Sequence, residues 1–223
     1  MVDMTYADVD GRKPGNTRKA LRGSVFFGLT SVTAITAITQ DSIASPGTPT
    51  LKALPAGMED IGALTDAGAV LARAVSSSDV NAWGFLEPVR RDITSDVTTV
   101  QLVGLETNKQ SVAVYHQVDP STLTLDATTA ELAVAKPVTP TAFYWRVLIL
   151  GVDQNDAGEI YIARYLPKAC LTSVGNMSFD SANDPVSYDL TLTAYIDDVL
   201  GYSDKTFYGG PGWQSIKTDM GFS

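Results

Sequence analysis

Side chains that commonly carry catalysis are sparse in this chain of 223 residues. His116 is the only histidine and Cys170 the only cysteine, so a multi-histidine metal site, a thiolate metal cage and an intrachain disulfide are excluded. No Gly-x-Ser-x-Gly motif accompanies His116, and no nucleophile, base and orienting group can be assembled around it. We therefore expect no catalytic centre, no cofactor and no metal.

Two sets of aspartates are spaced closely enough to resemble a carboxylate pair, Asp153 with Asp156 and Asp197 with Asp198. We interpret them as turn residues rather than as a general acid and base, because aspartate readily bonds its own backbone in turns. His116 falls on an expected helix, and we expect it at the surface or at its boundary.

The composition favours a surface that is unusually poor in charge. Hydrophobic residues make up 44% of the chain and charged residues 18%, which is below the usual quarter. Such a surface suits contact with other subunits, and it equally suits a monomer with a Thr- and Ser-rich exterior. The net charge of −9 divides into +1 for residues 1–50 and −10 for the rest. An acidic body argues against ordinary nucleic-acid binding, which needs clustered Lys and Arg.

The chain shows no pattern typical of secretion or of membrane insertion. Its N-terminus is polar, and its longest weakly polar stretch, residues 25–39, holds too many Thr and Ser for a membrane span. We expect a soluble protein that is made in a cytoplasm.

The sequence divides into three parts. Residues 1–20 combine charge with Pro14 and Gly15 and lack apolar periodicity, which predicts an extended N-terminal arm. Residues 21–208 are expected to form one β-rich domain, with a loop insertion near residues 40–56. Residues 209–223 are rich in glycine, which predicts a C-terminal arm.

Alternating apolar residues predict strands through most of the domain. The alternation is clearest over residues 186–197, and two further strands flank a polar turn at residues 154–158, as in a β-hairpin. Residues 68–94 are apolar on both alternating faces, which predicts a strand covered on both sides. We expect Trp83 and Trp145 in the core.

One helix is predicted at residues 106–118, with Thr107 or Asn108 as its N-cap and Asp119-Pro120 as its end. With roughly seven or eight strands and this flanking helix, the expected fold is mainly β, an antiparallel β-sandwich or barrel-like domain.

Four segments occur in an order and spacing that resemble a known family. They are residues 57–68 (GMEDIGALTDAG), 76–108 (SSSDVNAWGFLEPVRRDITSDVTTVQLVGLETN), 165–198 (YLPKACLTSVGNMSFDSANDPVSYDLTLTAYIDD) and 209–213 (GGPGW). In this arrangement the chain resembles the major tail proteins of siphovirus-type bacteriophages that infect actinobacteria. No single fragment is diagnostic. The likeness covers about residues 57–213, whereas residues 1–50 show no clear match.

The resemblance implies a structural virion protein with a tail-tube fold. Six subunits would form a ring whose inner sheets join into one β-barrel, and stacked rings would form the tube through which DNA is ejected. The implied partners are further copies of this chain, the tape-measure protein and phage DNA inside the lumen, and the tail terminator and tail-tip proteins at the ends. The implied location is the virion, with assembly in the host cytoplasm.

The terminal arms are the expected contacts between rings. Arg12, Lys13, Arg18 and Lys19 would dock on the acidic body of a neighbour, and Trp213 and Phe222 would anchor in it. The acidic charge itself has two interpretations: it keeps phosphate from sticking in the lumen, or it keeps the free subunit from associating early.

Two alternatives stay open. Another ring-forming tail component, such as a tail terminator, would stop at a single ring. A secreted carbohydrate-binding β-sandwich would need exposed aromatic stripes, a calcium loop and a secretion signal.

If the arms control polymerisation, deleting residues 1–20 or changing Trp213→Ala leaves a folded protein that forms no long tubes. Circular dichroism reports the fold and electron microscopy the tubes. Tubes of normal length from both variants would place ring stacking in the body of the domain.

Overall fold

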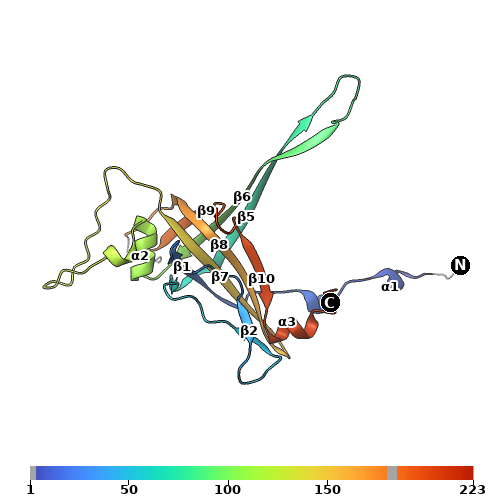
Figure 1. Cartoon of the computed structure of the whole chain (residues 1–223), viewed down its shortest axis with the longest axis horizontal. Helices are drawn as coiled ribbons and strands as arrows, with labels where there is room; N and C mark the ends of the chain where they lie inside the picture. The colour runs from blue at the N-terminus through green and yellow to red at the C-terminus, as the bar shows by residue number, and fades with distance from the viewer. Residues whose placement is uncertain (1–3, 180–184, 223) are drawn as a thin grey trace.

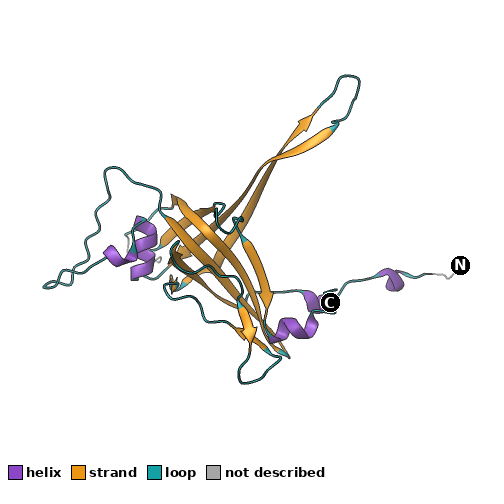
Figure 2. Ribbon diagram, in the orientation of Figure 1, coloured by secondary structure: helices purple, strands orange, loops and turns teal. Residues whose placement is uncertain are grey.

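The computed structural model describes residues 4–179 and 185–222, and β-strands dominate them (Figures 1 and 2). The helical elements are α1 (Tyr6–Val9), η1 (Pro14–Asn16), α2 (Lys109–His116), η2 (Pro120–Thr122) and α3 (Pro211–Ile216). The strands are β1 (Arg22–Leu29), β2 (Thr39–Asp41), β3 (Pro49–Leu51), β4 (Glu59–Asp60), β5 (Leu64–Val80), β6 (Arg90–Gly104), β7 (Tyr144–Asn155), β8 (Gly158–Val174), β9 (Tyr188–Ala194) and β10 (Lys205–Gly209). The predicted class, mainly antiparallel β with one flanking helix, is confirmed.

The main sheet curls toward closure. Its strand order is β4-β1-β7-β8-β9-β6-β5, with β10 paired to β8. The two ends of this order are neighbours in the chain, and the segment between them binds both sides. The Ile61 N–H donates to the Val25 carbonyl (3.0 Å), while the Leu105 N–H donates to the Ala63 carbonyl (2.8 Å). The segment between β4 and β5 thus links the two ends of the sheet, while the outer edge of β5 beyond Leu64 stays unpaired.

One face of the curled sheet forms the main core. Along β9 every second residue is buried, as the alternation over residues 186–197 predicts. Trp145 of β7 is buried as expected and packs edge-on against Phe27 of β1, with ring centroids 6.1 Å apart. On β8, one extra residue lies opposite β7 between Leu166 and Ala169. This β-bulge shifts the alternation, so that both residues face the same core.

The opposite face of β7 and β8 packs against a second apolar layer. Leu148, Tyr161 and Tyr165 lie on that face, and Ile35, Ile38 and Met58 cover it from the segment that leads to β4. The predicted insertion near residues 40–56 holds the short β2–β3 pair. Apolar side chains therefore cover both faces of these central strands, which accounts for their nearly continuous apolar sequence.

The β5–β6 hairpin leaves the body of the domain (Figure 1). β6 pairs with β9 only from Thr99 to Gly104, and its earlier residues pair only with β5. Residues 72–91 are exposed on both faces, apart from the partly buried Ala82. The expectation that residues 68–94 are covered on both sides was therefore wrong, and so was the expectation that Trp83 lies in the core. Alternation with apolar residues on both faces predicts a strand, but it does not show that anything covers it.

The helix is shorter than predicted and has the predicted kind of cap. Asn108 accepts a hydrogen bond from the Ser111 N–H (2.8 Å), and the Ser111 hydroxyl accepts one from the Asn108 N–H (2.9 Å). The helix ends where Gln117 adopts a left-handed conformation, with φ 54°. At the C-terminus, α3 packs against β8 and β10, whereas the N-terminal segment that carries α1 extends away from the body (Figure 1).

Leu192→Ala tests the main core. Leu192 is fully buried on β9, so the truncation leaves a cavity and lowers the free energy of unfolding by about 2–5 kcal/mol. Val138→Ala is the control, because Val138 is fully exposed, and its change stays within about 0.5 kcal/mol. Chemical denaturation measures both, and equal effects would contradict the assignment of the core.

Candidate assembly surface

The predicted basic contact residues lie at the base of the N-terminal arm and contact their own chain. Lys13 Nζ donates to the Asp219 carbonyl (2.8 Å), and Arg12 pairs with Asp10 (2.8 Å) in an exposed ion pair. Arg18 and the Lys19 N–H both approach Asp153 Oδ2, each at 3.4 Å. The part of the arm that extends beyond these contacts carries exposed Met4, Tyr6 and Val9.

The predicted aromatic anchors also contact their own chain. Trp213 stacks on Tyr208, with ring centroids 4.9 Å apart, and Phe222 lies 5.7 Å from Trp213. Gly212 lets α3 approach β8 closely, since a Cβ there would lie 2.5 Å from the Gly158 carbonyl oxygen. Trp213 is half-buried in this packing, so part of its surface is already covered within the subunit.

The turn that joins β5 to β6 exposes several large apolar side chains. Trp83 and Leu86 are fully exposed there, and Phe85 is exposed for about two thirds of its surface. Sequence reasoning missed this tip. The sequence signal was the pair Gly84 and Pro88, because glycine and proline together mark a turn and not the middle of a strand. In the structure Gly84 adopts φ 90°, as a turn glycine can.

The hairpin also carries unpaired backbone. Within the described residues, no strand pairs with the outer edge of β5 beyond Leu64, and none pairs with the outer edge of β6 before Thr99. Ion pairs join the two strands across their exposed faces, Arg73 to Asp96 and Arg91 to Asp79. These exposed ion pairs contribute little to stability. The unpaired outer edges of the hairpin are open to pairing with a partner strand.

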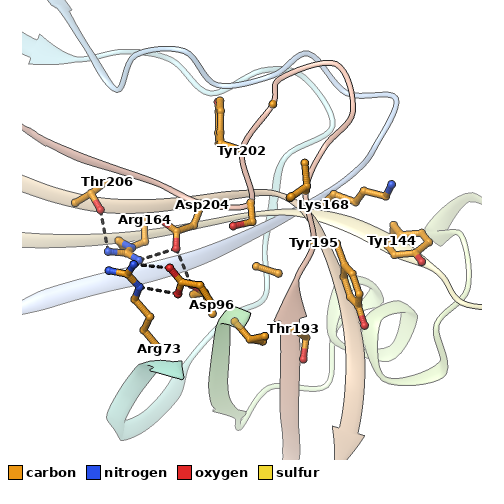
Figure 3. A pocket seen from close by; sticks show the side chains of 16 residues that line it. Arg73, Asp96, Tyr144, Arg164, Lys168, Thr193, Tyr195, Tyr202, Asp204 and Thr206 are labelled. Carbon is orange, nitrogen blue, oxygen red and sulfur yellow. Dashed lines mark hydrogen bonds and ion pairs between the residues drawn. The ribbon is translucent and has the colours of Figure 1, made fainter. Parts of the chain in front are cut away.

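A polar network fixes the base of the hairpin to the body (Figure 3). Arg164 of β8 donates to Asp204 (3.0 Å) and Thr206 (2.8 Å), and the Thr98 hydroxyl of β6 donates to the same Asp204 carboxylate (2.8 Å). These residues line a cavity of about 960 Å³. Its carboxylates are paired with arginines, so the network serves to hold β6, β8 and the β10 segment together.

The residues that sequence reasoning considered for chemistry lie in structural roles. Burial raises the pKa of the Cys170 thiol, which keeps it protonated and inert. His116 lies at the end of α2 with much of its surface exposed. The remaining desolvation of its imidazole lowers its pKa. Asp197 accepts hydrogen bonds from the N–H groups of Val199 (2.9 Å) and Leu200 (3.0 Å), as expected of a turn residue.

Asp153 corrects the interpretation of the aspartates as turn residues. It lies within β7 rather than in the turn that follows, and its residue is buried. The backbone N–H of Gln154, followed by the Lys19 N–H and Arg18, holds the pKa of the Asp153 carboxyl below its usual value against the effect of desolvation. The carboxylate therefore ties the base of the N-terminal arm to the sheet.

Two further observations concern residues 4–179 and 185–222. In these ranges no group of three or more His, Cys, Asp or Glu residues is placed to hold a metal ion. The helices within them are all too short or too polar to cross a membrane.

Comparisons with known proteins give weak likenesses only. No protein-family model and no curated protein matches the chain. A chain from the virion of a native gene transfer agent particle is 12% identical, with a TM-score of 0.33, and the match covers 69% of this chain and 89% of that one. A chain from the anti-feeding prophage baseplate is 14% identical, with a TM-score of 0.37, and the match covers 85% and 93%. These TM-scores are too low to support a functional argument.

Asp153→Asn tests the attachment of the arm. The variant loses the charge that faces Arg18, so trypsin is expected to cut after Arg18 and Lys19 about tenfold faster, while the domain stays folded. Because folding lowers the pKa of Asp153, its stabilisation is present at neutral pH and is lost as the pH falls below about 4 and through the folded-state pKa. Asp198→Asn, at a highly exposed carboxylate, is the control. Equal cleavage rates at pH 7 would show that Asp153 does not hold the arm.

Proposed function

We propose that this chain is the structural subunit of a bacteriophage tail tube, which assembles into rings that stack. The observation that carries the proposal is the β5–β6 hairpin, which extends from a well-packed body and presents bare Trp83, Phe85 and Leu86 at its tip. The order and spacing of the segments that resemble major tail proteins support it independently. The subunit has no catalytic part in this role.

The exposed tip favours association. Moving a large apolar side chain from water into an interface contributes roughly 1.5–3 kcal/mol, and the free subunit gains none of this from its tip. Aromatic side chains at a protruding position are typical centres of binding energy. If the tip of each hairpin contacts a different part of a neighbouring subunit, such contacts repeat head to tail and build a filament.

The unpaired edge of β5 supports lateral contact within a ring. It offers N–H and C=O groups to a neighbouring sheet, and such pairing would join the sheets of successive subunits around a channel. Six subunits per ring is the number that the sequence resemblance implies. A wall without excess Lys and Arg would let DNA pass, because it would form few of the salt bridges to phosphate that hold DNA back.

The remaining assignments follow from this role. The tape-measure protein and DNA would occupy the lumen without sequence-specific contacts, and terminator and tip proteins would close the ends. The virion would be the final location. A tail terminator shares a ring-forming body, and the length of the assembly separates the two functions: a tube subunit forms long stacks by itself, whereas a terminator stops at one ring.

The double variant Trp83→Ser, Leu86→Ser tests the hairpin. Both side chains are already exposed, so the melting temperature of the free subunit stays unchanged. Losing both contacts raises the concentration needed for tubes at least about a hundredfold. Sedimentation and electron microscopy measure the assembly.

Ile43→Ser is the matched control, since Ile43 is nearly fully exposed on a loop of the body. It should form tubes at the normal concentration. Unaltered tubes from the double variant would contradict the role of the hairpin, and single rings from the unaltered chain would favour the terminator.

A further inference from the structure

The strands β5, β6 and β9 share a sheet face that lies outside both apolar cores. Two rows of side chains run across all three strands on this face: Ala72, Thr99 and Thr193, then Val70, Gln101 and Thr191. Neither core of the described chain contains a residue of these rows. We call this surface the open face and bound it by the Val103–Asp189 pair at one end and the Ser76–Ser95 pair at the other.

The open face is almost free of charge. Asp189 is the only charged residue within its bounds, and the Gln101 side chain donates to the Asp189 carboxylate (3.3 Å). Arg73 and Asp96 occupy the alternate positions of the same strands and pair with each other on the opposite face. About a quarter of the residues of a typical domain are charged, and charged side chains usually lie at the surface. A sheet face without them fits a role in which charge is unfavourable.

The opposite face of these strands is already occupied within the body. Val100 and Leu102 of β6 point into the main core, and so do Leu190 and Leu192 of β9. Their contacts there include the cluster around Trp145. A wall built from β6 and β9 can therefore present only its open face to a channel.

A ring of subunits would carry the open face around its inside. The outer edge of β5 beyond Leu64 has no strand beside it, so a neighbouring copy can extend the sheet there without covering either face. Rotation about a ring axis turns the same face of every copy toward the axis. The bulk of the subunit lies on the core side of these strands, so an outward open face would place that bulk inside the ring and fill the channel.

An uncharged wall suits the passage of duplex DNA. Lys and Arg bind the phosphates of the backbone, whereas hydroxyl, amide and methyl groups form no ion pairs with them. Where the face continues toward the tip of the hairpin, Arg90 pairs with Asp92 and leaves no excess charge. Glu59, Asp60 and Asp119 lie beside α2 and outside the open face.

We propose that the open face of β5, β6 and β9 is the wall of the channel, over which duplex DNA passes without ionic contacts. The inference rests on the proposed function, since it names the surface of the subunit that the DNA meets. It assigns the lumen to an uncharged surface and places the acidic excess of the chain elsewhere.

Cysteine labelling tests which way the open face points. Ala72→Cys and Gln101→Cys place thiols at exposed positions of β5 and β6, and the unaltered chain gives the background from the buried Cys170. Free subunits of both variants should react with N-ethylmaleimide and with a maleimide that carries a large polyethylene glycol. In tubes we expect reaction with the small reagent to persist and reaction with the large one to be lost, because only the small reagent enters the channel.

Ile43→Cys is the matched control, at an exposed position on a loop of the body, and it should react with both reagents in tubes. Labelling of Ala72→Cys and Gln101→Cys tubes by the large reagent would place the open face outside. Loss of both reagents would bury it between copies, and equal protection of Ile43→Cys would show that exclusion is not particular to this face. Each of these results overturns the inference and leaves the proposed function intact. Absence of rings and tubes from the unaltered chain overturns both.

Gln101→Lys tests the occupant. The variant adds positive charge to the open face of every copy, so its tubes should retain short duplex DNA at low salt and release it as salt rises, whereas unaltered tubes retain none. DNA held in the channel should survive added nuclease, and DNA held by the Ile43→Lys control should be digested. Nuclease-resistant DNA in unaltered tubes would overturn the inference. So would Gln101→Lys tubes that retain no DNA, or only DNA that the nuclease digests.

Discussion

The β5–β6 hairpin has more apolar surface and more unpaired backbone than its own domain covers, and the proposed assembly depends on this imbalance. The body is self-sufficient, because its curled sheet has dry layers on both faces of the central strands. The hairpin, by contrast, exposes Trp83 and Leu86 fully. A free subunit gains nothing from this arrangement, and an assembly gains a contact at every copy.

The rest of the structure holds the base of the hairpin in place. Its two strands continue directly into β5 and β6 of the body, so the core packs one end of the same strands that project at the other. At the junction, Arg164 and Thr98 converge on Asp204 and hold β6 against β8. The direction in which the hairpin leaves the body is thus set at its base by the sheet.

Sequence patterns predicted the elements whose burial is local in origin. The alternation of β9 follows from one buried face, and the hairpin between β7 and β8 follows from the polar turn at residues 154–158. The helix follows from its Asn108 cap. The same reasoning placed Trp83 in the core, because a strand with apolar residues on both faces has the same sequence whether or not another layer covers it.

The candidate sites were harder to predict for a related reason. The polar network at the base of the hairpin joins Thr98, Arg164 and Asp204, which are distant in sequence and which only the fold brings together. The interface residues predicted in the arms were chosen for flexibility and charge, yet Lys13, Arg18 and Trp213 contact their own chain. Composition identifies such residues, and only the fold shows which surfaces they leave free.

Cryo-electron microscopy of the purified, unaltered chain at increasing concentration tests the central claim most directly. The account predicts stacked rings with a β-sheet wall, in which density for the hairpin of each subunit ends on a neighbouring subunit. Subunits that remain single at high concentration, or tubes in which the hairpins point into solvent, would contradict it.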